Sequence, residues 1–310
     1  MSRALEAAIA GQPEQLARIN ALDLDQPRRV LDGRRLWLVG TGSSLHAADL
    51  GAMAFVRGGV DARACSCLDF AHGDVSVAAQ DGVVVLSHTG ETATARAALA
   101  RARATVAAVV SVTGQGAGWP GAIETVPRER SQTYTVSYTA ALLVLGRLAG
   151  EQGLEAAPAA AADALGTQLE LESPARLLVL CGFGGAAVTA REGALKLREG
   201  ARLPAEGFDP EYLLHGSAVP LGGEDGLLLL APSSDPTGLT AGLGEAARAE
   251  GVAVAVLETP AGVSPLVAQI ALTVPLQLLA LRFSDRRGFD ADEVIVGSWA
   301  GEGLWALGGP

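Results

Sequence analysis

The stretch "WLVGTGSSLHAADLGA" (Trp37–Ala52) decides the fold, because the chain repeats its pattern as "VLCGFGGAAVTAREGA" (Val179–Ala194). Each stretch reads as a short apolar strand, a glycine-rich turn and the start of a helix. The glycines and several alanines of the two stretches coincide at a constant offset. This agreement is the first sign that the chain contains the same α/β unit twice.

The same order of elements continues outward from both stretches. "DGVVVL" (Asp81–Leu86) corresponds to "DGLLLL" (Asp225–Leu230), and a further apolar run at 105–113 corresponds to one at 251–259. A generic α/β pattern explains any one such pair, whereas three pairs in order favour duplication. The runs are apolar throughout, as strands are in a parallel sheet covered on both faces. We therefore predict an α/β fold of two tandem, doubly wound parallel-sheet (flavodoxin-like) domains related by internal duplication.

The predicted organisation has four parts. Residues 1–30 form an N-terminal helical segment, and residues 31–152 form the first domain. An Ala/Pro-rich connector follows at 153–174, and residues 175–310 form the second domain with a C-terminal tail. The tail carries Trp299, Leu304 and Trp305, and we expect it either to close over the site or to dock on a partner subunit.

Composition limits the classes of function. The net charge of −11 argues against nucleic acid, since phosphate contacts along a backbone need clustered basic groups. The N-terminus carries charges unlike a signal peptide, and no run approaches the roughly 18 apolar residues of a membrane span. The three cysteines have no metal-ligand spacing, so we read them as reduced structural thiols. A soluble, cytoplasmic protein is expected.

Hydroxyl side chains follow two strands of the first copy. Ser43 and Ser44 lie in the first glycine turn, and Ser87, Thr89 and Thr92 lie in "LSHTGETATARAAL". Two hydroxyl-rich helix N-termini at one sheet edge would suit a phosphate monoester. Alternatively, Thr92 is an ordinary N-cap and Ser87 an ordinary turn residue. The corresponding first turn of the second copy, "GFGGAAVT", has no early hydroxyl, which predicts one phosphate site per chain.

The first glycine turn has a second possible use. Gly40 and Gly42, with Asp61 about 20 residues further on, approach the dinucleotide-binding fingerprint, although Leu45 stands where its third glycine belongs. A dinucleotide-binding protein therefore stays open as an alternative.

Ionisable side chains gather in the second copy. "REGALKLREG" holds Lys196, the single lysine among 23 basic residues, and Glu192, Lys196 and Glu199 share one face of the predicted helix. A salt-bridged surface stripe is the simple interpretation, and a reactive site is the alternative. His215, in a loop of turn residues, is the best acid/base candidate among four histidines, and His88 is the second.

These motifs together carry a family resemblance. "EGALKLRE", "AEGFDPEYLLHG" and "SHTGETAT" resemble the sugar isomerase (SIS) domain pair, and in particular the isomerase half of glutamine–fructose-6-phosphate aminotransferases. The resemblance covers roughly residues 34–292. It implies a homodimer that binds a hexose 6-phosphate and needs no metal or organic cofactor. The phosphosugar-binding residues that it implies are Ser43, Ser44, Ser87, His88, Thr89 and Thr92.

The resemblance also implies catalytic roles. Glu199 matches the base that moves a proton between C1 and C2, Lys196 matches a lysine near the reacting carbons, and His215 matches a ring-opening histidine from the neighbouring subunit. The expected function is isomerisation of a hexose or hexosamine 6-phosphate, or an associated deamination. A deglycase and a non-catalytic phosphosugar sensor remain alternatives.

Departures from that family limit the expected chemistry. Tyr134 and Val136 stand where the family has serine and lysine, and the chain's C-terminal stretch contains no lysine. No glutaminase domain precedes the first copy in this sequence. We therefore do not expect glutamine-dependent amino transfer.

Overall fold

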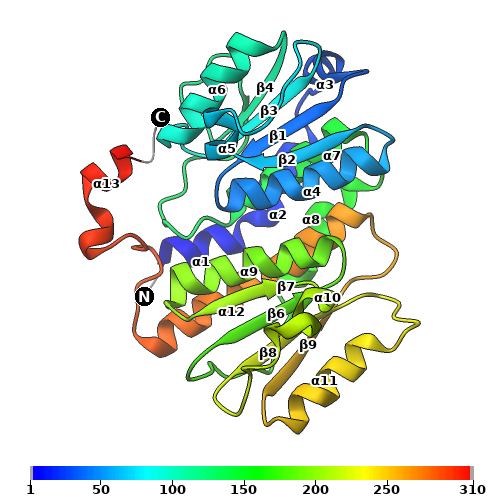
Figure 1. The fold of residues 1–310 in the computed structure, drawn as a ribbon, viewed down its shortest axis with the longest axis vertical. Helices are drawn as coiled ribbons and strands as arrows, with labels where there is room; N and C mark the ends of the chain where they lie inside the picture. Colours follow the sequence, from blue (N-terminus) through cyan, green and yellow to red (C-terminus); the bar gives the residue numbers. More distant parts are fainter. Residues whose placement is uncertain (1–2, 308–310) are drawn as a thin grey trace. The chain divides into compact units, whose positions relative to one another are not determined.

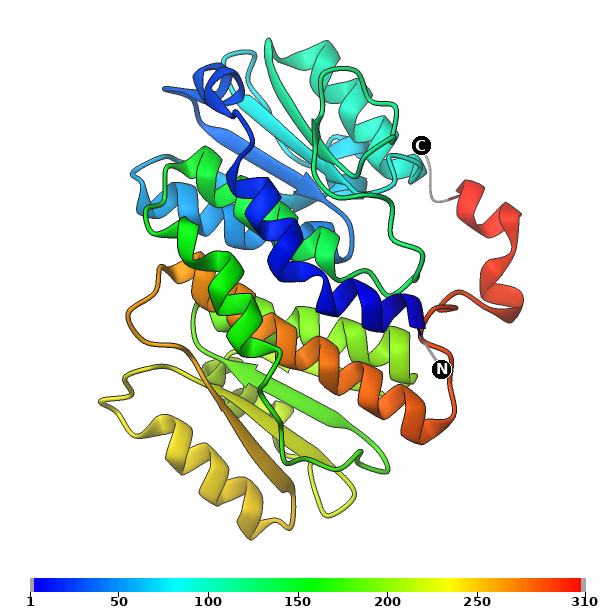
Figure 2. The same cartoon turned by 180° about the vertical axis from the view of Figure 1, so that it is seen from behind.

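The computed structural model describes residues 3–307 and groups them into two compact units (Figures 1 and 2). The β1–β5 unit comprises residues 14–130, 136–155 and 295–307. The β6–β9 unit comprises residues 3–13, 131–135 and 156–294. Each unit is described by itself.

Each unit is built on a parallel sheet. The β1–β5 sheet has the order β2-β1-β3-β4-β5 and the β6–β9 sheet has the order β7-β6-β8-β9, with every recorded pairing parallel. The strands are β1 (Leu36–Gly40), β2 (Ala62–Ser66), β3 (Gly82–Ser87), β4 (Ala108–Thr113), β5 (Ile123–Glu124), β6 (Leu178–Gly182), β7 (Ala205–Phe208), β8 (Gly226–Ala231) and β9 (Ala253–Glu258). The predicted α/β fold with parallel sheets is confirmed.

Helices cover both faces of the β1–β5 sheet. On one face Trp37 and Val83 pack with α5 and α6, and on the other Leu38 packs with α4 and α7. Central strands are therefore buried on both sides, which explains why their sequences are apolar without alternation. The helical elements are α2 (Gln12–Asn20, which begins in the other unit's residues), α3 (Asp25–Leu31), α4 (Ser43–Arg57), α5 (Cys67–His72), α6 (Ala93–Thr105), α7 (Val136–Ala149), η1 (Leu154–Ala156), η3 (Gly297–Ala300) and α13 (Glu302–Leu307).

The β6–β9 sheet is covered in the same way. Leu180 and Leu228 face α9 and α12, whereas Val179 and Leu227 face α11 and the turn at Leu213. The helical elements are α1 (Arg3–Ala10), α8 (Ala157–Ala164), α9 (Gly185–Ala201), α10 (Pro210–Tyr212), the π-helical turn η2 (Leu213–Ser217), α11 (Leu239–Ala249) and α12 (Pro265–Arg287). The predicted connector at 153–174 thus contains a helix, α8, whose alanines pack on α12.

Two glycines with equivalent places in the repeat allow close helix packing. A Cβ atom at Gly51 of α4 would lie 2.7 Å from a methyl group of Leu145 in α7 and 2.8 Å from one of Leu38 in β1. A Cβ atom at Gly193 of α9 would lie 2.6 Å from a methyl group of Leu276 in α12. Glycine at these positions lets one helix contact both its strand and a second helix.

α12 is a buried core helix. It is long and apolar enough to cross a membrane, but 83% of its apolar window is buried inside the protein. Its polar side chains are bonded within that core: Gln269 accepts a hydrogen bond from Thr189 at 2.7 Å, and Gln277 accepts one from Gln12 at 2.8 Å. Burial against neighbouring helices accounts for the apolar composition of α12.

Candidate functional site

The first hydroxyl turn joins β1 to α4. Gly42 has φ 58°, and a Cβ atom at Gly40 would lie 2.3 Å from the carbonyl oxygen of Ser44, so both positions require glycine. The helix begins at once with Ser43 and Ser44, which are half-buried. The sequence therefore folds into a strand–turn–helix that presents two hydroxyl groups at the carboxyl end of β1.

The second hydroxyl turn follows β3, which pairs directly with β1. The Ser87 hydroxyl accepts a hydrogen bond from the Gly90 amide at 3.2 Å, and the Thr89 hydroxyl accepts one from the Glu91 amide at 3.2 Å. Thr92 occupies the N-cap of α6, but its side chain makes no capping hydrogen bond. Ser87 therefore stabilises the turn, which was the alternative to phosphate binding for this residue. The exposed Thr92 side chain does not cap the helix.

His88 is held by a loop that follows β5. Its Nε2 accepts a hydrogen bond from the Glu129 amide at 3.1 Å, which requires an unprotonated Nε2. Burial lowers the pKa of His88, which favours the neutral ring. A Cβ atom at Gly114 would lie 2.5 Å from the imidazole Cε1. The close fit of the ring against Gly114 and the loop points to a role in positioning the turn.

The same loop fastens the turn at further points, which the sequence analysis missed. Arg128 of this loop forms two 2.7 Å hydrogen bonds with the carboxylate of Glu91. Trp119, in the connection between β4 and β5, donates its indole N–H to the Gly90 carbonyl at 3.1 Å. The Glu129 carboxylate accepts a hydrogen bond from the Ser137 amide in the first turn of α7 at 2.9 Å. Only the polar run "PRER" after β5 could have drawn attention to this loop.

The dinucleotide alternative is not supported by the sheet register. Gly40 ends β1, whereas Asp61 directly precedes β2, and its carbonyl oxygen accepts a hydrogen bond from the amide of Leu36, the first residue of β1. Asp61 and the glycine turn therefore lie at opposite ends of the strands, roughly 13 Å apart along a strand of this length. Asp61 instead forms an exposed ion pair with Arg63 at 3.4 Å.

The ionisable cluster of α9 is largely buried. Lys196 has a side chain only 1% exposed, and its Nζ lies 2.5 Å from Glu199 Oε2 and 3.5 Å from Glu192 Oε1. Glu192 is completely buried and Glu199 is 21% exposed. The simple interpretation, a solvated surface stripe, is therefore wrong: the shared helix face is buried, and of the three side chains only Glu199 is partly exposed.

The environment of Glu199 changes its acidity. Burial raises the pKa of Glu199, the nearby Lys196 ammonium opposes that rise, and the Glu192 carboxylate adds to it. A carboxylate with a raised pKa binds a proton more strongly than an exposed one and is a better general base. Lys196 contributes a positive charge beside it, in a place of low water content.

His215 lies at an irregular turn of the β6–β9 unit. It is exposed in η2, where its φ and ψ are non-helical and Gly216 has φ 114°. Its Nδ1 lies 2.9 Å from the Glu211 carbonyl oxygen, which can only accept a hydrogen bond. Nδ1 therefore carries a proton, and a neutral ring has Nε2 as its acceptor. Among residues 3–307, no recorded hydrogen bond or ion pair joins His215 to the α9 cluster.

The three cysteines are free thiols in the part of the chain that the structure describes. Burial raises the pKa of Cys65 to about 12 and that of Cys181 to about 12, and it also raises the pKa of Cys67. Thiols of this kind stay protonated and unreactive near neutral pH.

Comparisons with known proteins agree with this architecture. No protein-family model matches the chain. It is 27% identical over 308 residues to a glutamine–fructose-6-phosphate aminotransferase of Gloeobacter violaceus and 25% identical over 306 residues to that of Aquifex aeolicus. These matches cover 84% and 86% of the chain but 51% of each relative. The chain therefore spans about half the length of the curated relatives it matches.

Solved structures share the fold. The C-terminal domain of glucosamine–fructose-6-phosphate aminotransferase from Francisella tularensis superposes with a TM-score of 0.81 at 20% identity, covering 94% of this chain and 97% of that one. Tagatose-6-phosphate ketose/aldose isomerase from Escherichia coli gives 0.78 at 18% identity, covering 96% and 97%. Glucosamine-6-phosphate deaminase from Thermotoga maritima gives 0.77 at 18%, covering 93% and 96%. The parallel-sheet α/β fold is the one found in these phosphosugar enzymes.

Proposed function

We propose that this protein is a phosphosugar enzyme that moves a proton between C1 and C2 of a hexose or hexosamine 6-phosphate. The observation that carries the proposal is the buried Glu192–Lys196–Glu199 cluster, in which burial raises the pKa of Glu199. Burying an ammonium group beside two carboxylates costs free energy, and such buried charged groups are concentrated at functional sites. Relatives and structural neighbours that act on phosphosugars support the substrate class.

The hydroxyl turns supply the proposed phosphate site. In this mechanism Ser43, Ser44, Thr89 and Thr92 donate hydrogen bonds to the 6-phosphate, and His88 and Ser87 keep the second turn in place. Direct contact of Ser87 and His88 with the phosphosugar remains part of the prediction. Helix N-termini and hydroxyl groups can bind a phosphate monoester inside an acidic protein, because only local donors matter.

Proton transfer is assigned to the α9 cluster. Glu199 takes a proton from one carbon and returns it to the other, a contribution of about 10²–10⁴-fold for a positioned general base. The Lys196 ammonium stabilises the negative charge that develops on the enediolate oxygen. His215, through the acceptor at Nε2, moves the proton that opens the sugar ring, and we place it in the site of a neighbouring subunit of a homodimer.

The corresponding geometry of the two units supports duplication as their origin. Gly42 and Gly184 have φ of 58° and 54°, and Gly51 and Gly193 make matching helix contacts. We infer that a common ancestor unit specialised: one descendant kept the hydroxyl turns, and the other kept the ionisable cluster.

The experiment is solvent exchange in D₂O. Fructose 6-phosphate and glucosamine 6-phosphate are each incubated with the protein, and deuterium at C1 and C2 is followed by NMR. Wild type should incorporate deuterium into at least one of them, and Glu199→Gln should lower the rate at least about 100-fold while the phosphosugar still binds. The matched control, Glu250→Gln at the exposed end of α11, should exchange at the wild-type rate.

The outcome separates the candidate functions. Exchange accompanied by ammonia release from glucosamine 6-phosphate would identify a deaminase, which the structural likeness to the Thermotoga maritima enzyme favours as the second candidate. Phosphosugar binding without exchange would leave a sensor and would contradict the enzymatic proposal.

A further inference from the structure

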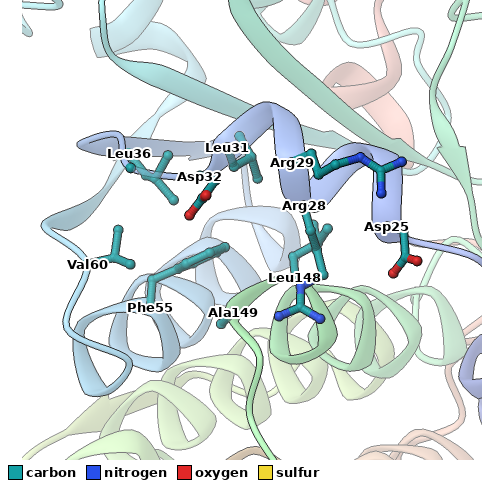
Figure 3. Close-up of a pocket in the computed structure, with 11 residues that line it drawn as sticks. Asp25, Arg28, Arg29, Leu31, Asp32, Leu36, Phe55, Val60, Leu148 and Ala149 are labelled. Carbon is teal, nitrogen blue, oxygen red and sulfur yellow. The ribbon is translucent and has the colours of Figure 1, made fainter.

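A pocket of the β1–β5 unit lies away from the hydroxyl turns. It has a volume of about 450 Å³ and is formed by α3, the end of α4, the end of α7 and the starts of β1 and β2 (Figure 3). Leu36 begins β1 and Val60 precedes β2, so the pocket lies at the amino-terminal edge of the sheet. Ser87 and its neighbours follow the strands' carboxyl ends, at the opposite edge. The pocket is therefore separate from the proposed phosphosugar site.

The pocket has an apolar floor and a charged rim. Phe55, Leu148 and Ala149 lie on the side of α4 and α7, and Arg28 extends towards them from α3 (Figure 3). A volume of this size is within the range of small-molecule sites, which combine apolar walls with a few charged groups. These apolar side chains supply the uncharged part of the lining.

The arginines of α3 are available to an anion. Arg28 and Arg29 are exposed, and no ion pair is recorded for either in the part of the chain that the structure describes. The Arg28 guanidinium lies against the backbone at Gly150, where its Nη2 is 3.1 Å from the place of a Cβ atom. Burial lowers the pKa of Arg147 in α7, and the nearby positive charge of Arg28 lowers it further. An anion at this point would offset the repulsion between like charges.

Acidic groups at the rim restrict where a ligand can carry negative charge. Asp25 and Asp32 line the same pocket, so negative charge spread along a ligand would be repelled. A single phosphate at the arginine end and an uncharged ring over Phe55 satisfy both conditions. We propose that this pocket binds an organic phosphate monoester with an uncharged planar ring, at a site distinct from the phosphosugar site.

The place of the pocket indicates an effector. α4 begins with Ser43 and Ser44 at the carboxyl edge of the sheet and ends beside the pocket, two residues beyond Phe55. A ligand on Phe55 would thus contact the far end of the helix whose first turn forms half of the proposed phosphate site. Nothing in this placement requires the ligand to be a substrate.

The test uses 1-naphthyl phosphate as the probe, with 1-naphthol and inorganic phosphate as its separate parts, in isothermal titration calorimetry. We expect saturable binding of the whole probe and affinities at least about tenfold weaker for each part. The double variant Arg28→Gln/Arg29→Gln should weaken binding at least about tenfold, since it removes the charged donors. Ala149→Leu, which fills the pocket without removing charge, should also weaken it.

Controls separate this pocket from other sites. Arg18→Gln removes an exposed arginine of α2 outside the pocket and should bind the probe as wild type does. Binding that survives Arg28→Gln/Arg29→Gln but is lost in Ser87→Ala/Thr89→Val would place the probe at the hydroxyl turns and overturn the proposal. Absence of saturable binding, or equal binding by inorganic phosphate, would also overturn it. These results do not depend on whether the protein exchanges deuterium into a sugar.

Discussion

Lys196 is a buried ammonium group held beside two carboxylates. Its Nζ contacts two carboxylates while its side chain is 1% exposed, so the charges of α9 are held where water is scarce. A buried charged group is stable there only if oppositely charged groups remain beside it. The cluster is therefore coupled to the stability of the protein as well as to the proposed reaction.

Removing that ammonium should destabilise the protein strongly. Lys196→Met leaves the fully buried Glu192 without the cation 3.5 Å away, and we expect a loss of about 3–5 kcal/mol in the free energy of unfolding by urea. Glu192→Gln/Lys196→Met should recover part of the loss. Arg286→Met, which breaks an exposed ion pair with Glu172, is the control and should cost less than about 1 kcal/mol. Equal effects of the two single variants would contradict a buried cluster.

The lowered pKa of His88 predicts a pH dependence of stability. Because the folded protein resists protonation of this ring, the unfolded chain binds more protons between the lowered pKa and the ordinary value of 6.5. Stability should therefore be complete above about pH 6.5 and fall as pH decreases from there towards the lowered pKa.

His88→Gln tests this sign, since an amide oxygen can still accept the Glu129 hydrogen bond but does not titrate in this range. Urea unfolding from pH 7.5 to 5 should show a smaller decline for this variant than for wild type. His72→Gln, an exposed histidine of α5, is the control. The same decline in His88→Gln as in wild type would refute the assignment.

At the scale of elements, the helices α4 and α9 are placed by small residues. Gly51 and Gly193 lie in mid-helix, where glycine costs about 1 kcal/mol relative to alanine in helix propensity. Close contact explains glycine at these positions, because each leaves room for a strand leucine and a leucine of the next helix. Packing therefore outweighs propensity at these two positions.

Alanine substitution separates the effect of helix propensity from the effect of close packing. Gly51→Ala and Gly193→Ala should each lower the unfolding free energy by about 1–3 kcal/mol, because the added methyl group would lie within 2.7 Å of a leucine side chain. The same change at Gly242 of α11, where a Cβ atom meets nothing within 4 Å, should instead stabilise by about 0.5–1 kcal/mol. A gain in stability at Gly51 or Gly193 would contradict the close packing.

At the scale of the whole molecule, the segment around His215 exposes apolar side chains that a partner protein could cover. Tyr212, Leu214 and Val219 are 65%, 55% and 84% exposed, and they flank the histidine whose proposed place is a neighbouring subunit's site. Apolar side chains clustered on a surface often mark an interface. A second copy of the chain is the partner that the proposed function requires.

Subunit mixing tests this arrangement. Glu199→Gln and His215→Ala should each be inactive in the deuterium exchange, but equal amounts unfolded, mixed and refolded together should recover about a quarter of wild-type activity. Half of the dimers would then be mixed, and each would contain one site with both native residues. Each variant refolded alone is the control. No recovery, with dimers present by light scattering, would place His215 outside the partner's site.

Local patterns in the sequence were sufficient to predict the strands of the sheets and the glycine turns. Apolar runs predict strands buried on both faces, and glycine followed by a helix predicts the turns, because both depend on residues next to each other in the chain. The parallel α/β fold was predicted for this reason, and the hydroxyl groups were placed on the right turns. The spacing of Glu192, Lys196 and Glu199 likewise predicted their shared helix face.

Only the tertiary structure decided what covers that face and what meets each turn. Periodicity shows which residues lie together on α9, but burial of Lys196 depends on distant segments that pack against it. Asp61 appeared near a dinucleotide site by sequence distance, yet strand register places it at the opposite edge. The bond from Glu129 to His88 and the pocket at Arg28 likewise join residues far apart in the chain, so sequence alone gave no sign of them.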